Sequence, residues 1–291
     1  MCRSRSTLQT VGADLSPSLF SHGLGGSRQG YVYLGREWAR RGYVSIHVQH
    51  VGSDSELLRK KGLWAIYRAP FNGEEYADRP LDISFVIDVL ERRAGAAESG
   101  SLWGKLDLSR IGVCGHSYGA HTALTLVGML VNFPQHDGRS FRDVRVKAAL
   151  LISPPAMAWS PTAKEFAPIH SPTMHMSGSR DTSRLWHITL LHRRRAFDCI
   201  RAAPRYFLNI EGAAHSTFAD HETILLAKGN GRLDRTDPPR LRPRNADHQR
   251  QIDLILEFSD AFWDAYLMGS DAATSWLDPV EPSGAALERG E

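Results

Sequence analysis

Short apolar runs alternate along this chain with longer segments whose apolar residues recur at helical spacing. We predict strands at 19–21, 43–48, 109–114, 146–152, 173–177 and 205–210. We predict helices at 31–41, 79–93, 118–131, 183–197 and 249–268. The run at 146–152 is continuously apolar, as strands buried on both faces of a parallel sheet are. The alternation predicts an α/β fold, with a mostly parallel sheet covered by helices on both faces.

Nothing in the pattern divides the chain, so we predict a single domain over residues 19–270. Residues 1–18 are polar and are expected to be disordered, and residues 271–291 are expected to form a polar tail. Residues 54–80 are rich in aromatics and are expected to form a cap-like insert near the site. Residues 228–249 are rich in Arg, Asp, Pro and Gly, which is typical of a surface loop.

Composition narrows the class of protein. Apolar residues make up 42% of the 291 residues and charged residues 23%, which is ordinary for a globular domain. The net charge is +3, with basic and acidic residues interleaved, so we expect no nucleic-acid partner. The 3 cysteines form neither a disulfide framework nor a zinc spacing, and we expect no metal or cofactor. No apolar run is long enough to cross a bilayer.

The most informative motif is Gly115-His116-Ser117-Tyr118-Gly119, which matches G-x-S-x-G. An apolar strand precedes it and a helix rich in Ala and Leu follows. A serine in that position lies on a sharp turn, and the small flanking residues allow strand and helix to approach closely. The turn raises the Ser117 hydroxyl above the sheet at a helix N-terminus, so we predict that Ser117 is a nucleophile.

A serine nucleophile needs a base and an acid that orients the base. His215 follows the strand 205–210 through a short flexible loop, which favours it as the base. His116 adjoins Ser117, but adjacent residues at such a turn point in different directions. Asp181 follows the strand 173–177 and gives the chain order Ser, Asp, His, so we predict it as the acid. A helix N-cap is the alternative role for Asp181; Asp198 and Asp220 are weaker candidates.

An acyl-transfer intermediate also needs backbone N–H donors for its oxyanion. One is expected from Tyr118, the residue after the nucleophile. The glycine-rich segment His22-Gly23-Leu24-Gly25-Gly26 follows the first strand, and its glycines allow the backbone to approach a substrate. We predict Leu24 as the second donor, with a simple glycine-rich turn as the alternative.

Four segments together resemble the α/β-hydrolase superfamily: SHGLGGSR (21–28), GHSYGA (115–120), SGSRDTS (177–183) and GAAHSTFAD (212–220). They are similar to bacterial serine esterases that resemble platelet-activating-factor acetylhydrolase and are often labelled predicted dienelactone hydrolases. Polyester hydrolases share the pattern. The resemblance implies a cofactor-independent serine esterase or lipase-type enzyme with Ser117 as nucleophile, Asp181 as acid, His215 as base, and Leu24 and Tyr118 as oxyanion donors.

The chain departs from these families at three places. True dienelactone hydrolases have a cysteine nucleophile, whereas position 117 is serine. The mammalian acetylhydrolase carries its acid after the strand that follows the nucleophile helix. That place here reads Ser153-Pro154-Pro155-Ala156, which leaves Asp181. Only about twenty residues precede the glycine segment, so the N-terminal strands look shortened. Either the start codon is placed too late, or the sheet begins with an exposed edge, which would favour a homo-oligomer.

The remaining expectations concern substrate and location. Trp64 and Trp159 are candidate substrate-binding residues for a small-molecule or lipid-like ester, although packing under a loop is the commoner role of such aromatics. The helix containing Arg193, Arg194 and Arg195 is expected to be a solvated face. The N-terminus lacks a signal-peptide core and predicts a cytoplasmic protein, while a longer N-terminus would allow secretion. An amidase or peptidase, or an inactive binding module, are the alternative functions.

Overall fold

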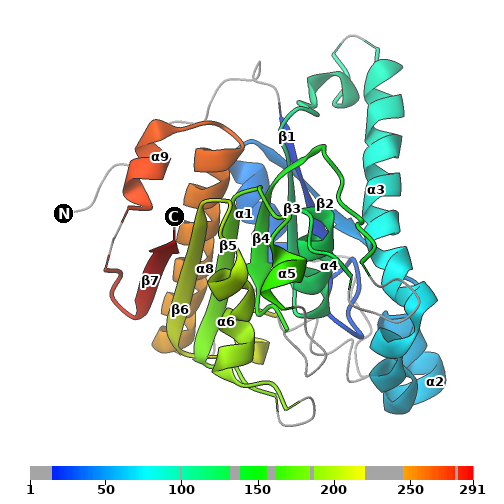
Figure 1. Ribbon diagram of the computed structural model, residues 1–291. Helices are drawn as coiled ribbons and strands as arrows, with labels where there is room; N and C mark the ends of the chain where they lie inside the picture. Colours follow the sequence, from blue (N-terminus) through cyan, green and yellow to red (C-terminus); the bar gives the residue numbers. More distant parts are fainter. Residues whose placement is uncertain are drawn as a thin grey trace.

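The computed structural model describes residues 15–98, 100–131, 138–155, 162–183, 187–219, 245–278 and 281–290. Its centre is a seven-stranded sheet in the order β2-β1-β3-β4-β5-β6-β7 (Figure 1). The strands are β1 (Ser16–Ser21), β2 (Tyr43–Val48), β3 (Ile111–His116), β4 (Val146–Ile152), β5 (Thr173–Arg180), β6 (Arg205–Ala214) and β7 (Ala285–Gly290). Neighbouring strands from β2 to β6 pair in parallel, and β7 pairs antiparallel with β6. The prediction of an α/β fold with a mostly parallel sheet is confirmed.

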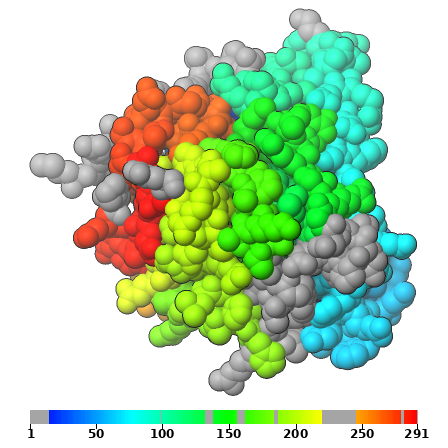
Figure 2. Space-filling view, in the orientation of Figure 1, coloured from blue at the N-terminus to red at the C-terminus, as the bar shows by residue number. Residues whose placement is uncertain are grey.

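Helices cover both faces of this sheet. They are α1 (Val32–Arg40), α2 (Ser55–Arg68), α3 (Gly73–Gly95), α4 (Tyr118–Leu126), α5 (Ala163–Phe166), α6 (Leu190–Cys199), α8 (Ala246–Tyr266) and α9 (Asp271–Trp276). Successive strand side chains point to opposite faces. Leu150 therefore joins the core formed with α1 and α8, while Leu151 joins the core formed with α3, α4 and α6. The space-filling view places α2 and α3 at one side of the molecule and α8, α9 and β7 at the other (Figure 2).

Two predicted boundaries and the predicted position of the first strand in the sheet were wrong. Residues 271–291 are not a polar tail, because they contain α9 and β7, whose Leu287 pairs with Leu208 of β6. Residues 16–18 belong to β1, where Ser16 and Ser18 are fully buried between two parallel neighbours. The first strand is therefore interior, and the edges of the sheet in the described part of the chain are β2 and β7.

The segment 54–80 is also more regular than a loop-like insert. Asp54 caps α2 by accepting a hydrogen bond from the Leu57 N–H at 2.9 Å, and Gly62 kinks the helix with φ 76°. A short 3-10 turn (Ala69–Phe71) then leads into α3, which begins at Gly73 and contains Pro80. The helix expected at 183–197 begins only at Leu190. Most of the predicted loop 228–249 lies outside the described residues, and its last residues belong to α8 and its N-cap, Asn245.

Polar residues lie together at the carboxyl-terminal ends of the parallel strands. The carboxyl ends of β1, β3, β4, β5 and β6 lie side by side in the sheet. The residues at or just after these ends are Ser21, Ser117, Ser153, Asp181 and His215. In open α/β sheets, ligands bind beside the carboxyl-terminal ends of the strands.

Candidate active site

Ser117 lies at a sharp turn between β3 and α4. Its backbone has φ 54° and ψ −118°, a conformation that costs free energy for any residue other than glycine. A Cβ at Gly115 would overlap the Gly119 carbonyl, and a Cβ at Gly119 would overlap the Ser21 carbonyl of β1. The close approach of strand and helix thus requires glycine at both positions. The Ser117 N–H donates to the Ile152 carbonyl at 2.8 Å, which fixes the turn to β4.

Two hydrogen-bond contacts connect Ser117 to a buried carboxylate. The Oγ of Ser117 lies 3.1 Å from Nε2 of His215, and Nδ1 of His215 lies 3.0 Å from Oδ1 of Asp181. The Asp181 side chain is fully buried, whereas that of His215 is 35% exposed. The structure therefore brings together the three residues that we predicted from separate segments. To act as a general base, His215 must be in the tautomer whose Nδ1–H donates to Asp181 and whose Nε2 accepts from the Ser117 hydroxyl.

Three further side chains surround Asp181. The Ser153 hydroxyl donates to Oδ2, the Ser177 hydroxyl donates to the same oxygen at 3.1 Å, and Nε of Arg193 lies 3.1 Å from Oδ1. Burial by itself raises the pKa of Asp181. The hydrogen bond from His215 and the charge of Arg193 outweigh burial and hold that pKa well below its usual range. Asp181 is therefore ionised at neutral pH and acts as a hydrogen-bond acceptor.

The alternative roles and acids can now be placed. Thr189 occupies the N-cap position of α6, so Asp181 does not cap that helix. Asp198 lies on α6 and pairs with Arg194. Asp220 lies outside the described residues.

The prediction that 193–195 form a solvated face was wrong for one residue. The side chain of Arg193 is only 1% exposed. Its Nη1 donates to the Ser153 carbonyl at 2.7 Å, and its Nη2 lies 3.0 Å from Nδ1 of His215. Arg194 instead pairs with Asp198 and Glu288 near the surface. The contact between Arg193 and Nδ1 competes with the bond from Nδ1–H to Asp181, since a guanidinium can only donate.

His116 contributes packing beside the base. Its ring centroid lies 4.6 Å from that of His215, and its Nδ1 lies 2.7 Å from the Tyr31 hydroxyl. Burial lowers the pKa of His116 well below its ordinary value, so the ring is neutral. We predicted correctly that His116 does not face Ser117 as a base, but missed that its ring supports the base.

The glycine segment after β1 lies directly against Ser117. A Cβ at Gly23 would lie 3.5 Å from the Ser117 Cβ. Leu24 and Tyr118 pack in one small apolar cluster. Within the described part of the chain, the Leu24 N–H donates no hydrogen bond. Tyr118 is the first residue of α4, where an N–H has no partner inside the helix. Leu24 and Tyr118 therefore stay candidates for the two oxyanion donors.

The predicted substrate residues are less well placed. Trp64 is 68% exposed, and its ring stacks on Tyr67 of the same helix with centroids 5.5 Å apart. Trp159 lies outside the described residues. The part of α2 that approaches the site is its other face, because Leu58 and Ile66 lie within 4 Å of a Cβ built on Gly25. Sequence reasoning missed this face and the buried contacts of Ser153 and Arg193, for which the sequence holds no motif.

Comparison with known proteins adds no assignment. No protein-family model matches the chain, and a search of curated proteins finds no match. Among the described residues, no group of His, Cys, Asp and Glu side chains is arranged to hold a metal ion. No helix in the described ranges combines the length and apolarity that crossing a bilayer requires. The arrangement of Ser117, His215 and Asp181 thus has to be interpreted from its own chemistry.

Proposed function

We propose that this chain is a serine hydrolase of the α/β-hydrolase fold that cleaves carboxylic esters through an acyl-enzyme. One observation carries the proposal: two hydrogen-bond contacts link Ser117 through His215 to the buried Asp181. A hydroxyl is a weak nucleophile unless a positioned base takes its proton. The strained turn at Ser117 and the two candidate N–H donors beside it add the geometry that acyl transfer needs.

In the first half-reaction, Ser117 Oγ attacks the ester carbonyl while Nε2 of His215 takes the hydroxyl proton. Asp181 holds Nδ1–H and stabilises the positive charge that forms on the imidazole. The negative charge on the former carbonyl oxygen is held by the N–H groups of Leu24 and Tyr118. His215 then gives its proton to the leaving alcohol, and the acyl group stays on Ser117.

In the second half-reaction, water takes the place of the alcohol. His215 removes a proton from the water, the hydroxide adds to the acyl carbonyl, and the same N–H groups hold the oxyanion. The intermediate collapses by breaking the bond to Ser117 Oγ, which regains a proton from His215. The products are a carboxylic acid and an alcohol, with no redox change and no cofactor.

The substrate class follows from the resemblance of the four motifs to acetylhydrolase-like bacterial esterases. We propose a small-molecule or lipid-like ester, with polyesters as a related class. The strand order supports the fold proposal, because the segments that carry the glycine loop, the nucleophile, the acid and the base all end at one edge of the sheet.

The test compares purified wild type with Ser117→Ala on p-nitrophenyl acetate, butyrate and decanoate. We expect wild-type turnover and a loss of about 10⁴-fold or more in kcat for the variant, as for other triad nucleophiles. Ser109→Ala is the matched control, because Ser109 is an exposed serine before the opposite end of β3. It should retain wild-type kinetics.

A fluorophosphonate probe gives a second, substrate-independent readout. It should add one phosphonyl group to wild type on the peptide containing Ser117 and none to Ser117→Ala. Comparing an ester with the matching anilide separates an esterase from an amidase. A folded wild type that neither turns over esters nor reacts with the probe would contradict the proposal.

A further inference from the structure

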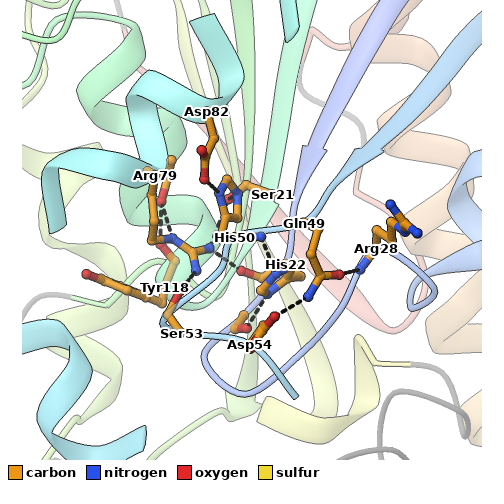
Figure 3. Close-up of polar contacts among 12 residues, drawn as sticks. Ser21, His22, Arg28, Gln49, His50, Ser53, Asp54, Arg79, Asp82 and Tyr118 are labelled. Carbon is orange, nitrogen blue, oxygen red and sulfur yellow. Dashed lines mark hydrogen bonds and ion pairs between the residues drawn. The ribbon is translucent and has the colours of Figure 1, made fainter. Parts of the chain in front are cut away.

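A second group of buried polar side chains lies behind the glycine loop, and its centre is Arg79 of α3 (Figure 3). Arg79 is 1% exposed. Its Nε donates to the Thr122 hydroxyl at 2.9 Å and its Nη1 to the Ser53 hydroxyl at 2.7 Å. Its Nη2 donates to the Ser21 hydroxyl at 3.0 Å and also to the His22 carbonyl. The guanidinium is therefore held on all sides by neutral oxygens.

No carboxylate among the described residues makes an ion pair with Arg79. Burial lowers the pKa of Arg79 to about 10, so the side chain still carries its charge at neutral pH. A buried cation without a carboxylate in contact is unfavourable for stability, since removing the charge from water is only partly offset by neutral acceptors. The cost in stability indicates that the charge and the hydrogen bonds of Arg79 have a role other than stabilising the fold.

A series of hydrogen bonds connects Arg79 to the carboxylate of Asp82, which lies one turn further along α3. Nδ1 of His50 lies 2.8 Å from Oδ2 of Asp82, and Nε2 of His50 lies 2.9 Å from the Ser21 hydroxyl. A guanidinium only donates and an ionised carboxylate only accepts. The bonds therefore run from Arg79 to Ser21, from Ser21 to His50 and from His50 to Asp82. Burial lowers the pKa of His50 far below its ordinary value, so the link is neutral.

Ser21, His50 and Asp82 have the residue types of a Ser-His-Asp triad, but Ser21 cannot serve as a nucleophile. Ser21 and His50 are fully buried, so a substrate has no access to the hydroxyl. The Ser21 oxygen also accepts a hydrogen bond from Arg79. The arrangement instead orients the guanidinium and connects it through Ser21 and His50 to the negative charge of Asp82.

Arg79 contacts both segments that carry the proposed oxyanion donors. The His22 carbonyl that it binds immediately precedes Gly23 and Leu24. Ser53, which it binds through the hydroxyl, also accepts the Gly25 N–H at 2.8 Å through its carbonyl. On the other side, the guanidinium carbon lies 4.5 Å from the centre of the Tyr118 ring.

The far end of the glycine segment is held separately. The Arg28 N–H donates to Oε1 of Gln49 at 2.9 Å, and Nε2 of Gln49 donates to Asp54 at 2.6 Å (Figure 3). The segment is therefore fixed at both ends. Arg79 contacts its first residues through the His22 carbonyl and the start of α4 through the Tyr118 ring.

We propose that Arg79 is a positioning residue of the oxyanion hole, which sets the distance between the Leu24 and Tyr118 N–H groups and adds a buried positive charge behind them. The inference rests on the proposed ester hydrolysis. Its physical basis is that fixed donors and charges act most strongly in a site from which water is excluded. They favour the oxyanion over the neutral ester, so the effect belongs in kcat and not in KM.

The experiment measures kcat and KM for p-nitrophenyl butyrate together with the inhibition constant of a trifluoromethyl ketone, whose hemiketal carries the oxyanion. For Arg79→Met we expect kcat to fall by about 10²-fold, in the range for loss of an oxyanion donor, with KM within about threefold of wild type. Ketone affinity should fall by the same factor as kcat/KM. Arg79→Lys keeps a charge but lacks the planar fork, and kcat should fall by about tenfold.

Arg205→Met is the matched control. Arg205 is also a buried arginine beside an aromatic ring, with its guanidinium carbon 5.5 Å from the Phe197 ring centroid. It is the first residue of β6, and therefore lies at the opposite end of the parallel strands from Ser117. Its loss should lower the melting temperature and leave kcat and ketone affinity unchanged.

The outcomes separate this inference from the proposed function. Wild type without turnover or phosphonylation removes the proposed function itself. Active wild type with unchanged kcat and ketone affinity in folded Arg79→Met overturns the inference alone, even if that variant melts earlier. If Arg79→Met does not fold, Arg79→Lys decides: wild-type kcat in that variant overturns the positioning role, and a lower kcat at constant KM supports it.

Discussion

At the scale of single residues, Arg193 sets the charge around the proposed base. Its guanidinium contacts Asp181 and lies 3.0 Å from Nδ1 of His215. The substitution Arg193→Met has two effects. Asp181 loses one hydrogen-bond donor, so its negative charge acts more strongly on His215, and the imidazole loses a neighbouring cation. Both changes stabilise the protonated imidazole, which is the inactive form of the base. We therefore expect the acidic limb of kcat/KM against pH to lie at higher pH in this variant than in wild type.

A pH-stat assay of butyrate ester hydrolysis between pH 4 and 9 measures this shift. Breaking a buried ion pair also costs about 3–5 kcal/mol of stability, so the assay is run well below the melting temperature of the variant. Arg194→Met is the matched control, because Arg194 lies on the same helix but pairs with Asp198 and Glu288. An unchanged limb, or a shift to lower pH, in Arg193→Met contradicts the assigned role.

The candidate site shows which residues a sequence can indicate. Ser117, Asp181 and His215 were predictable because each follows a recognisable strand, and their order along the chain is informative. Arg193 was not, because three consecutive arginines look alike until the rotation of α6 buries one of them. Arg79 was missed for a similar reason: its contacts come from three other segments, and their proximity arises only when the chain folds.

At the scale of elements, the elbow depends on direct contact between β1 and α4. A Cβ at Gly119 would overlap the Ser21 carbonyl, and backbone atoms move less readily than the end of a side chain. Gly119→Ala should lower the free energy of unfolding by about 3 kcal/mol, the cost of a severe overpacking. In a chain of this size that corresponds to a melting temperature lower by roughly 8 °C. Circular dichroism measures the melting curve.

The matched control for that prediction is Gly95→Ala. Gly95 ends α3, and a Cβ built there meets nothing within 4 Å. Alanine should therefore leave the melting temperature unchanged or raise it, because it favours the helix by up to about 1 kcal/mol. Equal melting temperatures for Gly119→Ala and wild type would show that the elbow tolerates a side chain and would remove the packing argument.

Elements were predictable where burial makes their pattern strong. Strands β2 to β6 were found because apolar runs there are bounded by turn residues. β7 was missed because most of its residues are partly or fully exposed, so its apolar pattern is weak, and because its partner β6 lies far from it in the sequence. α2 was missed because basic and apolar residues are mixed along it and Gly62 interrupts it.

At the scale of the whole molecule, one buried acid connects two helices, α8 and α1, that pack in the same core on one face of the sheet. Asp260 of α8 is almost fully buried and lies 3.5 Å from Nε of Arg41, just after α1. Burial raises the pKa of Asp260, and the charges of Glu37 and Asp264 act in the same direction against the opposing effect of Arg41, so that the pKa lies at about 8. The folded protein therefore keeps a proton on Asp260 at pH values where the unfolded chain has released it.

This difference gives stability a defined dependence on pH. Because the folded pKa lies above the unfolded value of 3.8, the contribution of Asp260 is fully present below about pH 4 and is lost as pH rises toward about 8. Asp260→Asn has no such proton. Relative to wild type, the variant should gain stability across that window, by up to about 1.4 kcal/mol per pH unit, and gain no more above it.

Urea unfolding of both proteins at pH 5, 6, 7, 8 and 9 measures this difference directly. Taking the difference matters, because buried histidines such as His22 and His175 also titrate on unfolding and contribute equally to both proteins. Asp253→Asn, an exposed position on the same helix, should follow wild type at every pH. A constant difference between Asp260→Asn and wild type would show that Asp260 is ionised in the folded state, and that Arg41 compensates its charge in full.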